Sequence, residues 1–241
     1  MKAMIFAAGL GTRLQPLTND RPKALVELGG MTLLERCIKR LISFNITDIV
    51  INVHHFADLM EDYLLAHDNF GANIQVSDER EMLMNTGGAI RHAKSLLAGN
   101  EPILIVNVDI LSDLNFTNLL EYHTKANNLA TLVVRQRETS RYLLFNEDFL
   151  CGWKNIKTGE TKTSRPNLID NASPFAFSGI QIISPEFLNL ITETGAFSSI
   201  DMYLRLAQQE KIGAFIDANS IWMDLGKYSD IHTANKLLEL K

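Results

Sequence analysis

Apolar residues along this 241-residue chain gather in short continuous runs that polar stretches separate. Runs of this kind are typical of strands buried on both faces of a parallel sheet. The runs that predict strands are residues 1–8, 48–53, 73–76, 102–109, 130–135, 177–183 and 213–217. Between them, apolar positions spaced three and four residues apart predict helices. The predicted helices are one that follows Thr32 and others at residues 57–67, 87–97, 116–126, 200–208 and 228–240.

Strands and helices alternate in the first half of the chain. This alternation predicts an α/β fold with a doubly wound, mostly parallel sheet flanked by helices. The second half is less regular: residues 142–145 and 150–156 predict a hairpin or a sheet edge, and the polar residues 157–173 predict a surface loop. No internal repeat or linker divides the pattern, so we expect one domain over residues 1–241.

Composition and charge exclude several classes of protein. The net charge of -5 argues against nucleic acid or an anionic membrane as a partner. No apolar stretch has the length of a signal peptide or of a membrane span. Cys37 and Cys151 are the two cysteines, far apart, and we expect them to be reduced thiols in a cytoplasmic protein. No His and Cys cluster has the spacing of a zinc site.

The first strand runs into a turn of small residues with two basic residues close by. Residues 7–25 read AAGLGTRLQPLTNDRPKAL, which places Arg13 and Lys23 beside this turn. In open α/β sheets, ligands bind beyond the carboxyl ends of the strands. A turn of small residues there lets backbone N–H groups approach a phosphate, and the two cations neutralise its charge. The segment therefore indicates a polyphosphate site, although a tight turn with solvated charges stays an alternative.

Two better-known phosphate motifs do not fit this segment. A dinucleotide-binding fingerprint needs a third glycine where Leu14 stands and an acidic residue at the end of the second strand, where residues 52–55 read NVHH. A Walker loop needs a Gly-Lys-Ser/Thr sequence, which does not follow here. A dehydrogenase and a P-loop enzyme are therefore disfavoured.

The whole segment resembles the signature of the sugar-1-phosphate nucleotidyltransferases. The matching positions are Gly9, Gly11, Thr12, Arg13, Leu14, Pro16, Leu17, Thr18, Pro22 and Lys23. The resemblance continues over nearly all of the chain, through Thr86 with its two following glycines, Asp109, residues 177–180 (FSGI) and residues 222–226 (WMDLG). It implies a mixed, mostly parallel Rossmann-like sheet in a single-domain nucleotidyltransferase fold, without a C-terminal hexapeptide-repeat domain.

The resemblance also implies a reaction and roles for individual residues. A sugar-1-phosphate attacks the α-phosphate of a nucleoside triphosphate, and pyrophosphate leaves. Arg13 is expected to contact the β- and γ-phosphates, and Lys23 the α-phosphate or the sugar phosphate. Asp109 and Asp224 are expected to hold Mg²⁺, which prefers one or two carboxylates together with phosphate oxygens. For either aspartate considered alone, the simpler interpretation is a structural carboxylate at a strand end or a helix cap.

The remaining roles concern the base and the sugar. The resemblance implies nucleotide contacts from Ala8, Gly9, Gly11, Thr12, Asn85, Thr86 and Gly87, and sugar contacts from Ser178 and Gly179. Asn85 or Thr86 can equally be an ordinary helix N-cap. Gly179 can equally mark a bulge in its strand.

Three positions depart from the family pattern and bear on the substrate. Val108 replaces the usual glycine before the first metal-binding aspartate, Asn85 stands where Gly or Glu is common, and residues 164–166 read SRP instead of EKP. The motifs resemble the N-acetylmuramate-1-phosphate uridylyltransferases most. Mannose- or heptose-1-phosphate guanylyltransferases, phosphocholine cytidylyltransferases and a catalytically silent nucleotide-sugar sensor stay as alternatives. The expected partners are a nucleoside triphosphate and a sugar-1-phosphate, without nucleic acid or membrane, in a monomer or small homo-oligomer.

Overall fold

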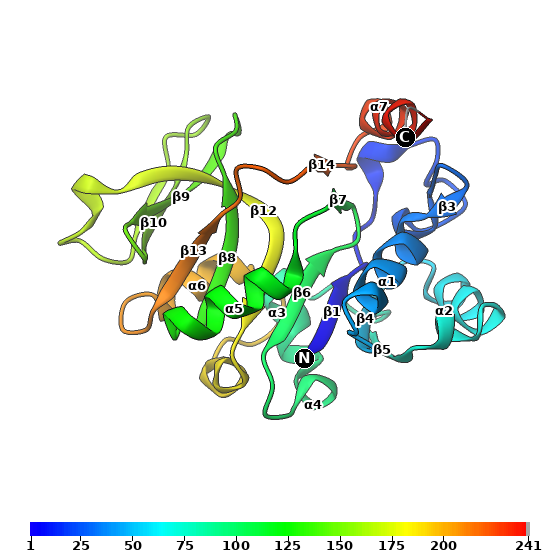
Figure 1. Cartoon of the computed structure of the whole chain (residues 1–241), viewed down its shortest axis with the longest axis horizontal. Coiled ribbons are helices and arrows are strands. Elements are labelled where there is room, and N and C mark those ends of the chain that lie inside the picture. The colour runs from blue at the N-terminus through cyan, green and yellow to red at the C-terminus, as the bar shows by residue number, and fades with distance from the viewer. Residues whose placement is uncertain (240–241) are drawn as a thin grey trace.

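A single ten-stranded sheet organises the computed structural model, which describes residues 1–239 (Figure 1). Its main part has the strand order β13-β8-β12-β6-β1-β4-β5. The bounds are β1 (Lys2–Phe6), β4 (Asp48–Val53), β5 (Asn73–Asp78), β6 (Ile103–Asn107), β8 (Ala130–Arg135), β12 (Ser173–Ile183) and β13 (Ile212–Ile216).

The directions of the strands make this sheet mixed but mostly parallel. β1 pairs in parallel with β4 and β6, β4 with β5, and β8 with β13. Only β12 is antiparallel to its neighbours β6 and β8 in this part of the sheet. The predicted fold class is confirmed. Because β12 opposes both neighbours, β8 runs in the same direction as β6, and both end at the same edge.

A hairpin extends the sheet beside the first residues of β12. It consists of β9 (Arg141–Asn146) and β10 (Phe149–Asn155), as the sequence predicts, and β9 pairs with β12. The prediction of a loop over residues 157–173 is wrong in part, because β11 (Thr161–Thr163) pairs with β10 and a 3-10 turn covers Ile169–Asn171. β10 would otherwise have an open edge, and the two threonines of β11 are β-branched residues that suit a strand.

Helices cover both faces of the sheet (Figure 1). The helices α1 (Leu33–Ser43), α2 (Ala57–Ala66), α5 (Phe116–Ala126) and α7 (Tyr228–Glu239) contribute to one buried apolar cluster. The helices α3 (Asn85–His92), α4 (Lys94–Leu97) and α6 (Ser199–Leu206) contribute to a second. Successive residues of β1 divide between the two, with Ala3 and Ile5 in the first and Met4 in the second. This alternation explains why strands buried on both faces appear as continuous apolar runs.

Most of the predicted helices and strands are present in the structure, but many begin or end at other residues than predicted. β4, β8 and α5 have the predicted bounds. The predicted helix at 87–97 divides into α3 and α4 at Ala93. Thr32 caps α1, because its Oγ1 accepts a hydrogen bond of 3.0 Å from the backbone N–H of Glu35. The predicted end of the last helix, Leu240, lies outside the described residues.

Besides β11, four very short strands are absent from the sequence prediction. β2 (Glu27–Leu28) pairs with β3 (Met31–Thr32), and β7 (Ile110–Ser112) pairs with β14 (Trp222–Asp224). The second pair matters for function, because it joins the segment after β6 to a segment near the end of the chain. Among the described helices, none has both the length and the apolar character that crossing a bilayer requires.

Candidate active site

The turn that follows β1 is shaped by Gly11. Its φ of +66° lies in the left-handed region that favours glycine. A Cβ at this position would lie 3.0 Å from Cγ2 of Thr18 and 3.1 Å from Cβ of Lys23. Oγ1 of Thr18 also donates a hydrogen bond of 2.9 Å to the backbone oxygen of Gly11. Gly11 therefore allows the segment that carries Lys23 to pack directly against the turn.

A cavity of about 210 Å³ opens between this turn and the carboxyl ends of β4, β5 and β6. Six residues with predicted roles lie around it: Ala8, Gly9, Lys23, Asn85, Thr86 and Asp109. They come from four separate parts of the chain, so the fold brings the proposed nucleotide contacts to one place. Their individual roles toward a nucleotide stay predictions.

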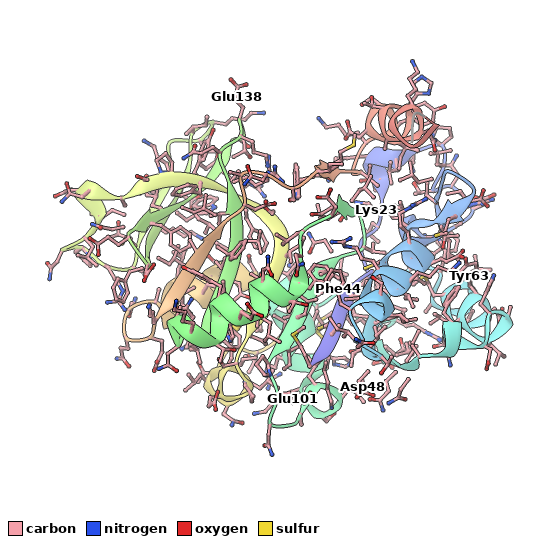
Figure 2. All side chains as sticks on the ribbon, viewed as in Figure 1. Lys23, Phe44, Asp48, Tyr63, Glu101 and Glu138 are labelled. Carbon is pink, nitrogen blue, oxygen red and sulfur yellow. The ribbon has the colours of Figure 1, made fainter. Side chains whose placement is uncertain are left out.

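Lys23 and Asp109 form an ion pair at this cavity. Lys23 is only 9% exposed, because it begins a 3-10 turn that packs behind Gly11. Figure 2 shows Lys23 beside β7, in the upper half of the view. A solvated surface lysine would be far more exposed, so the alternative of a turn with solvated charges does not describe Lys23.

Asp224 lies next to Asp109 through backbone contacts. In the pairing of β14 with β7, Asp224 is opposite Ile110, and the N–H of Leu225 donates a hydrogen bond of 2.8 Å to the backbone oxygen of Asp109. Oδ1 of Asp224 accepts a hydrogen bond of 2.8 Å from the N–H of Gly226. The β7–β14 pair is thus the element that brings the backbones of the two aspartates side by side.

Arg13 approaches the same place from the first turn. A Cβ on Gly226 would lie 2.8 Å from Nη2 of Arg13 and 2.7 Å from Oδ1 of Asp224. Arg13 is exposed, as is Thr12 before it. Gly226 is therefore the residue that leaves room for the guanidinium of Arg13 beside Asp224.

The segment at the start of α3 is held by a distant loop. The N–H groups of Gly87 and Gly88 donate hydrogen bonds of 2.9 and 3.2 Å to the backbone oxygen of Phe197. A Cβ on Gly87 would lie 2.5 Å from the Phe197 ring, so only glycine fits there. Gly87 is buried in this contact, whereas Asn85 and Thr86 are exposed and line the cavity.

Neither polar residue at this helix start caps α3. Asn85 has a φ of +57°, and no side chain caps the helix. Oγ1 of Thr86 instead accepts a hydrogen bond of 2.9 Å from the N–H of Ser199 at the start of α6. The N-cap alternative therefore does not describe this turn.

Two buried polar residues of the cavity wall, Asn52 and Glu79, were not predicted. Asn52 is the second-last residue of β4, and Glu79 follows β5. They are 4% and 2% exposed, and Nδ2 of Asn52 donates a hydrogen bond of 2.8 Å to Oε1 of Glu79. The signal that could have identified Asn52 is a single amide within the apolar run DIVINV.

The expected sugar-binding segment lies in a bulge of β12. The pairing of β12 with β8 shifts register between Phe177 and Gln181. Gly179 there has a φ of +75°, and a Cβ on it would lie 2.9 Å from Nδ2 of Asn107. Ser178 is fully buried, and its backbone oxygen accepts a hydrogen bond of 2.9 Å from Nε1 of Trp222. The sugar contacts of Ser178 and Gly179 stay predictions.

Two of the departures from the family pattern also have defined positions. Val108 is 5% exposed and belongs to the apolar core, although it also borders the cavity. Arg165 does not line the cavity. Its Nη2 donates a hydrogen bond of 2.9 Å to the backbone oxygen of Glu210, and its guanidinium carbon lies 4.8 Å from the centre of the Phe149 ring.

A sequence model of the family described as "Nucleotidyl transferase" matches residues 2–241. The chain belongs to the nucleotidyl transferase family. The predicted enzyme class is thereby confirmed, together with the resemblance on which it was based.

Relatives in this family cover most of the chain. An N-acetylmuramate alpha-1-phosphate uridylyltransferase from Caulobacter vibrioides is 34% identical over 232 residues, which are 93% of this chain and 91% of the relative. A mannose-1-phosphate guanyltransferase from Kluyveromyces lactis is 31% identical over 241 residues, 95% of this chain. The match spans only 62% of that guanyltransferase.

Solved structures share the fold at low sequence identity. A UDP-glucose pyrophosphorylase solved with UDP-glucose superposes with a TM-score of 0.77 at 19% identity, over 99% of this chain and 98% of that protein. HddC from Yersinia pseudotuberculosis has a TM-score of 0.75 at 20% identity, over 98% of this chain and 99% of HddC. These similarities extend over the whole sheet and its helices.

Proposed function

We propose that this protein transfers a nucleoside monophosphate from a nucleoside triphosphate to a sugar-1-phosphate and releases pyrophosphate. The observation that carries the proposal is the meeting of Lys23, Asp109 and Asp224 at one edge of the sheet, beside a cavity of about 210 Å³. Cations and carboxylates gathered beyond the ends of parallel strands suit two anionic reactants that must be held together.

The reaction needs positioning and charge neutralisation more than proton transfer. An oxygen of the sugar phosphate, ionised at neutral pH, forms a bond to the α-phosphorus, and the bond from this phosphorus to the oxygen bridging to the β-phosphate breaks. Pyrophosphate leaves with that electron pair. Lys23 neutralises charge at the α-phosphate, and Arg13 neutralises charge on the departing phosphates. These interactions strengthen as negative charge develops in the transition state.

Mg²⁺ is part of the proposal. The donor set fits this ion, because Asp109 and Asp224 supply two carboxylates from neighbouring backbone positions and the remaining ligands would be phosphate and water oxygens. Among the described residues, no group of three or more His, Cys, Asp or Glu side chains is suitable for a metal, so the protein contributes only this pair. Bound Mg²⁺ supplies charge neutralisation on the phosphate oxygens.

N-acetylmuramate-1-phosphate and UTP are the substrates we favour. The Caulobacter uridylyltransferase matches over 91% of its own length, whereas the Kluyveromyces guanyltransferase matches over 62%. Mannose-1-phosphate and GTP are the second candidate pair, since that guanyltransferase covers 95% of this chain. A cytoplasmic location, with Cys37 and Cys151 as free thiols, and a monomer or small homo-oligomer complete the proposal.

Pyrophosphate release measured with Mg²⁺ tests the proposal. UTP, GTP, CTP, dTTP and ATP are crossed with N-acetylmuramate-1-phosphate, mannose-1-phosphate, a heptose-1-phosphate and phosphocholine. We expect turnover with UTP and N-acetylmuramate-1-phosphate and none without Mg²⁺. Binding of a nucleotide sugar without any pyrophosphate release across the panel would instead identify a sensor.

A further inference from the structure

Arg137 lies at the ligand-binding edge of the sheet. β6 ends at Asn107 and is followed by Asp109, and β8 ends at Arg135 and is followed by Arg137. β6 and β8 run in the same direction on either side of β12, so Arg137 emerges at the same edge as Asp109. The next residue, Glu138, stands above β8 in Figure 2, in the upper half of the view with Lys23, whereas Asp48 and Glu101 lie in the lower half.

The side chain of Arg137 contacts two residues at the expected sugar-binding segment, Trp222 and Phe177, and its Nη1 donates a hydrogen bond of 3.4 Å to the backbone oxygen of Glu138. Its guanidinium carbon lies 4.6 Å from the centre of the Trp222 ring. Nη2 donates a hydrogen bond of 3.1 Å to the backbone oxygen of Phe177, and Trp222 itself is bonded to Ser178. A planar guanidinium fixed in this way is preorganised to present its remaining N–H groups to an oxyanion.

The charge of Arg137 has no carboxylate within 4.0 Å in the part of the chain that the structure describes, although the side chain is half-buried. Its Nε is buried and makes no hydrogen bond with the described residues. Burial lowers the pKa of Arg137 below its usual value, while the negative charge of Asp224 acts in the opposite direction. A desolvated cation without a counter-ion costs free energy that an anionic ligand would recover.

Arg135, two residues earlier, lacks this property. It also lies over the Trp222 ring, at 5.7 Å, but its Nη1 forms an ion pair of 3.0 Å with Asp217, which is 5% exposed. Its Nη2 donates a hydrogen bond of 3.0 Å to the backbone oxygen of Ser220. The two arginines beside the Trp222 ring therefore differ in their charged partners: Arg135 has a carboxylate partner, whereas Arg137 has none among the described residues.

We propose that Arg137 binds an oxyanion of the acceptor substrate, either the phosphate that every sugar-1-phosphate carries or the carboxylate of an acidic sugar. This inference rests on the proposed function. It also accounts for a departure noted above, because Arg165, in the segment where the family pattern has Glu-Lys-Pro, donates to Glu210 and is not directed at the cavity.

Steady-state kinetics of Arg137→Gln test the inference. At saturating nucleotide, we expect the KM for N-acetylmuramate-1-phosphate to rise by roughly tenfold or more, because a desolvated charge contact is lost, while the KM for the nucleotide stays unchanged. N-acetylglucosamine-1-phosphate, which lacks the carboxylate, is measured as a substrate or as a competitive inhibitor. A parallel loss with both sugars identifies the phosphate as the ligand, and a loss with N-acetylmuramate-1-phosphate alone identifies the carboxylate.

Two further variants keep the test decisive. Arg137→Lys retains the charge and should lie between wild type and Arg137→Gln, whereas Arg91→Gln removes an exposed arginine of α3 and should match wild type. An unchanged sugar KM in folded Arg137→Gln, or an equal rise in both KM values, would overturn the inference.

A direct binding signal separates this inference from the proposed function. In a Trp153→Phe background, Trp222 is the remaining tryptophan, and its fluorescence should change when the sugar phosphate binds beside Arg137. If wild type turns over no substrate pair but the Trp153→Phe protein shows this change, and adding Arg137→Gln abolishes it, the proposed function fails and the inference stands. No change in the Trp153→Phe protein would overturn the inference.

Discussion

The side-chain amide of Asn52 donates a hydrogen bond of 2.8 Å to the carboxylate of Glu79 in the wall of the candidate active-site cavity. Oδ1 of Asn52 accepts from the N–H of Ala7 at 2.8 Å, and Oε2 of Glu79 accepts from the N–H of Met84 at 3.1 Å. The pair therefore connects the turn after β1 to the segment that begins α3. Both segments are expected to hold the nucleotide, so this buried pair fixes their separation.

Asn52→Leu should damage both stability and nucleotide binding. Leucine has the same branched skeleton but leaves the N–H of Ala7 and an oxygen of Glu79 without a partner, which costs about 2–4 kcal/mol in free energy of unfolding. We also expect the KM for the nucleotide to rise several-fold. Urea unfolding and steady-state kinetics measure the two effects. Gln75→Leu, at an exposed position of β5, serves as the control. Wild-type values for both quantities would show that the pair does not position the site.

Asp109→Asn and Asp224→Asn should each abolish Mg²⁺-dependent turnover in a folded protein. Each change keeps the shape of the side chain and removes one of the two carboxylates proposed to hold the ion, so we expect the rate to fall by roughly a thousandfold or more. Pyrophosphate release and the melting temperature are measured together. Asp62→Asn, an exposed position of α2, is the matched control. A folded Asp224→Asn protein with the wild-type rate would remove Asp224 from the metal site.

Lys23→Met should lower turnover in a protein that still folds. Methionine preserves much of the buried aliphatic chain but removes the positive charge, so kcat should fall by about a hundredfold. The melting temperature should also fall, because the change removes one partner of a buried ion pair and leaves the Asp109 carboxylate without its counter-charge. The rate is therefore measured at a temperature where the variant is folded. Lys39→Met, which breaks the 2.7 Å ion pair of Lys39 with Glu35 on α1, is the control and should keep full activity. Equal activity in both variants would make Lys23 a structural residue.

Gly226→Ala should lower activity by steric displacement. The added Cβ would lie 2.7 Å from Oδ1 of Asp224 and 2.8 Å from Nη2 of Arg13, so at least one of these groups must move. Displacements of about 1 Å in an active site cost up to a hundredfold in rate. We expect kcat to fall at least tenfold while the melting temperature stays close to that of wild type. Full activity would mean that Arg13 does not act from the position seen here.

The buried strands and the glycine turn after β1 could be predicted from the sequence for physical reasons. Strands buried on both faces must be apolar at every position, so β4 and β8 appear as uninterrupted runs with clear ends. The turn after β1 combines small residues with Arg13 and Lys23 in a long signature, and Gly11 has the left-handed backbone and close neighbours that require a glycine.

The remaining parts depend on contacts between distant segments. β7 and β14 have three residues each and no periodic pattern, so their pairing, which unites Asp109 with Asp224, has no local signal. The burial of Gly87 against Phe197 likewise has no local sequence signal, because the two residues lie far apart along the chain. The sequence also does not reveal that, among residues 1–239, Arg137 has no carboxylate within 4.0 Å, since Arg135 two residues earlier has a partner and looks equivalent.

His123 provides a prediction about acid stability. The imidazole is 2% exposed on α5 and lies 2.8 Å from Oγ1 of Thr131 and 3.1 Å from Oγ of Ser184. Ser184 donates to the backbone oxygen of Asn128, and Nδ2 of Asn128 donates to Thr131. Ser184 can therefore only accept from Nε2–H, and Thr131 can only donate to Nδ1. This network assigns the neutral tautomer that carries its proton on Nε2.

Burial lowers the pKa of His123 to about 4, and the charge of Glu186 acts weakly in the opposite direction. In the unfolded chain the pKa of a histidine is about 6.5. Between these values the unfolded chain binds a proton that the folded protein does not, so the free energy of unfolding falls as the pH falls from about 6.5 toward 4. At pH 5 this single group should remove about 2 kcal/mol relative to pH 7.5.

His123→Leu should remove this part of the pH dependence. The variant will be less stable at pH 7.5, because Thr131 and Ser184 lose a partner, but its stability should decline less between pH 7.5 and pH 5 than that of wild type. Urea unfolding at the two pH values gives the difference, and His232→Leu, an exposed histidine of α7, should retain the wild-type slope. If His123→Leu and wild type lose the same free energy of unfolding, the neutral, buried state of His123 does not limit acid stability.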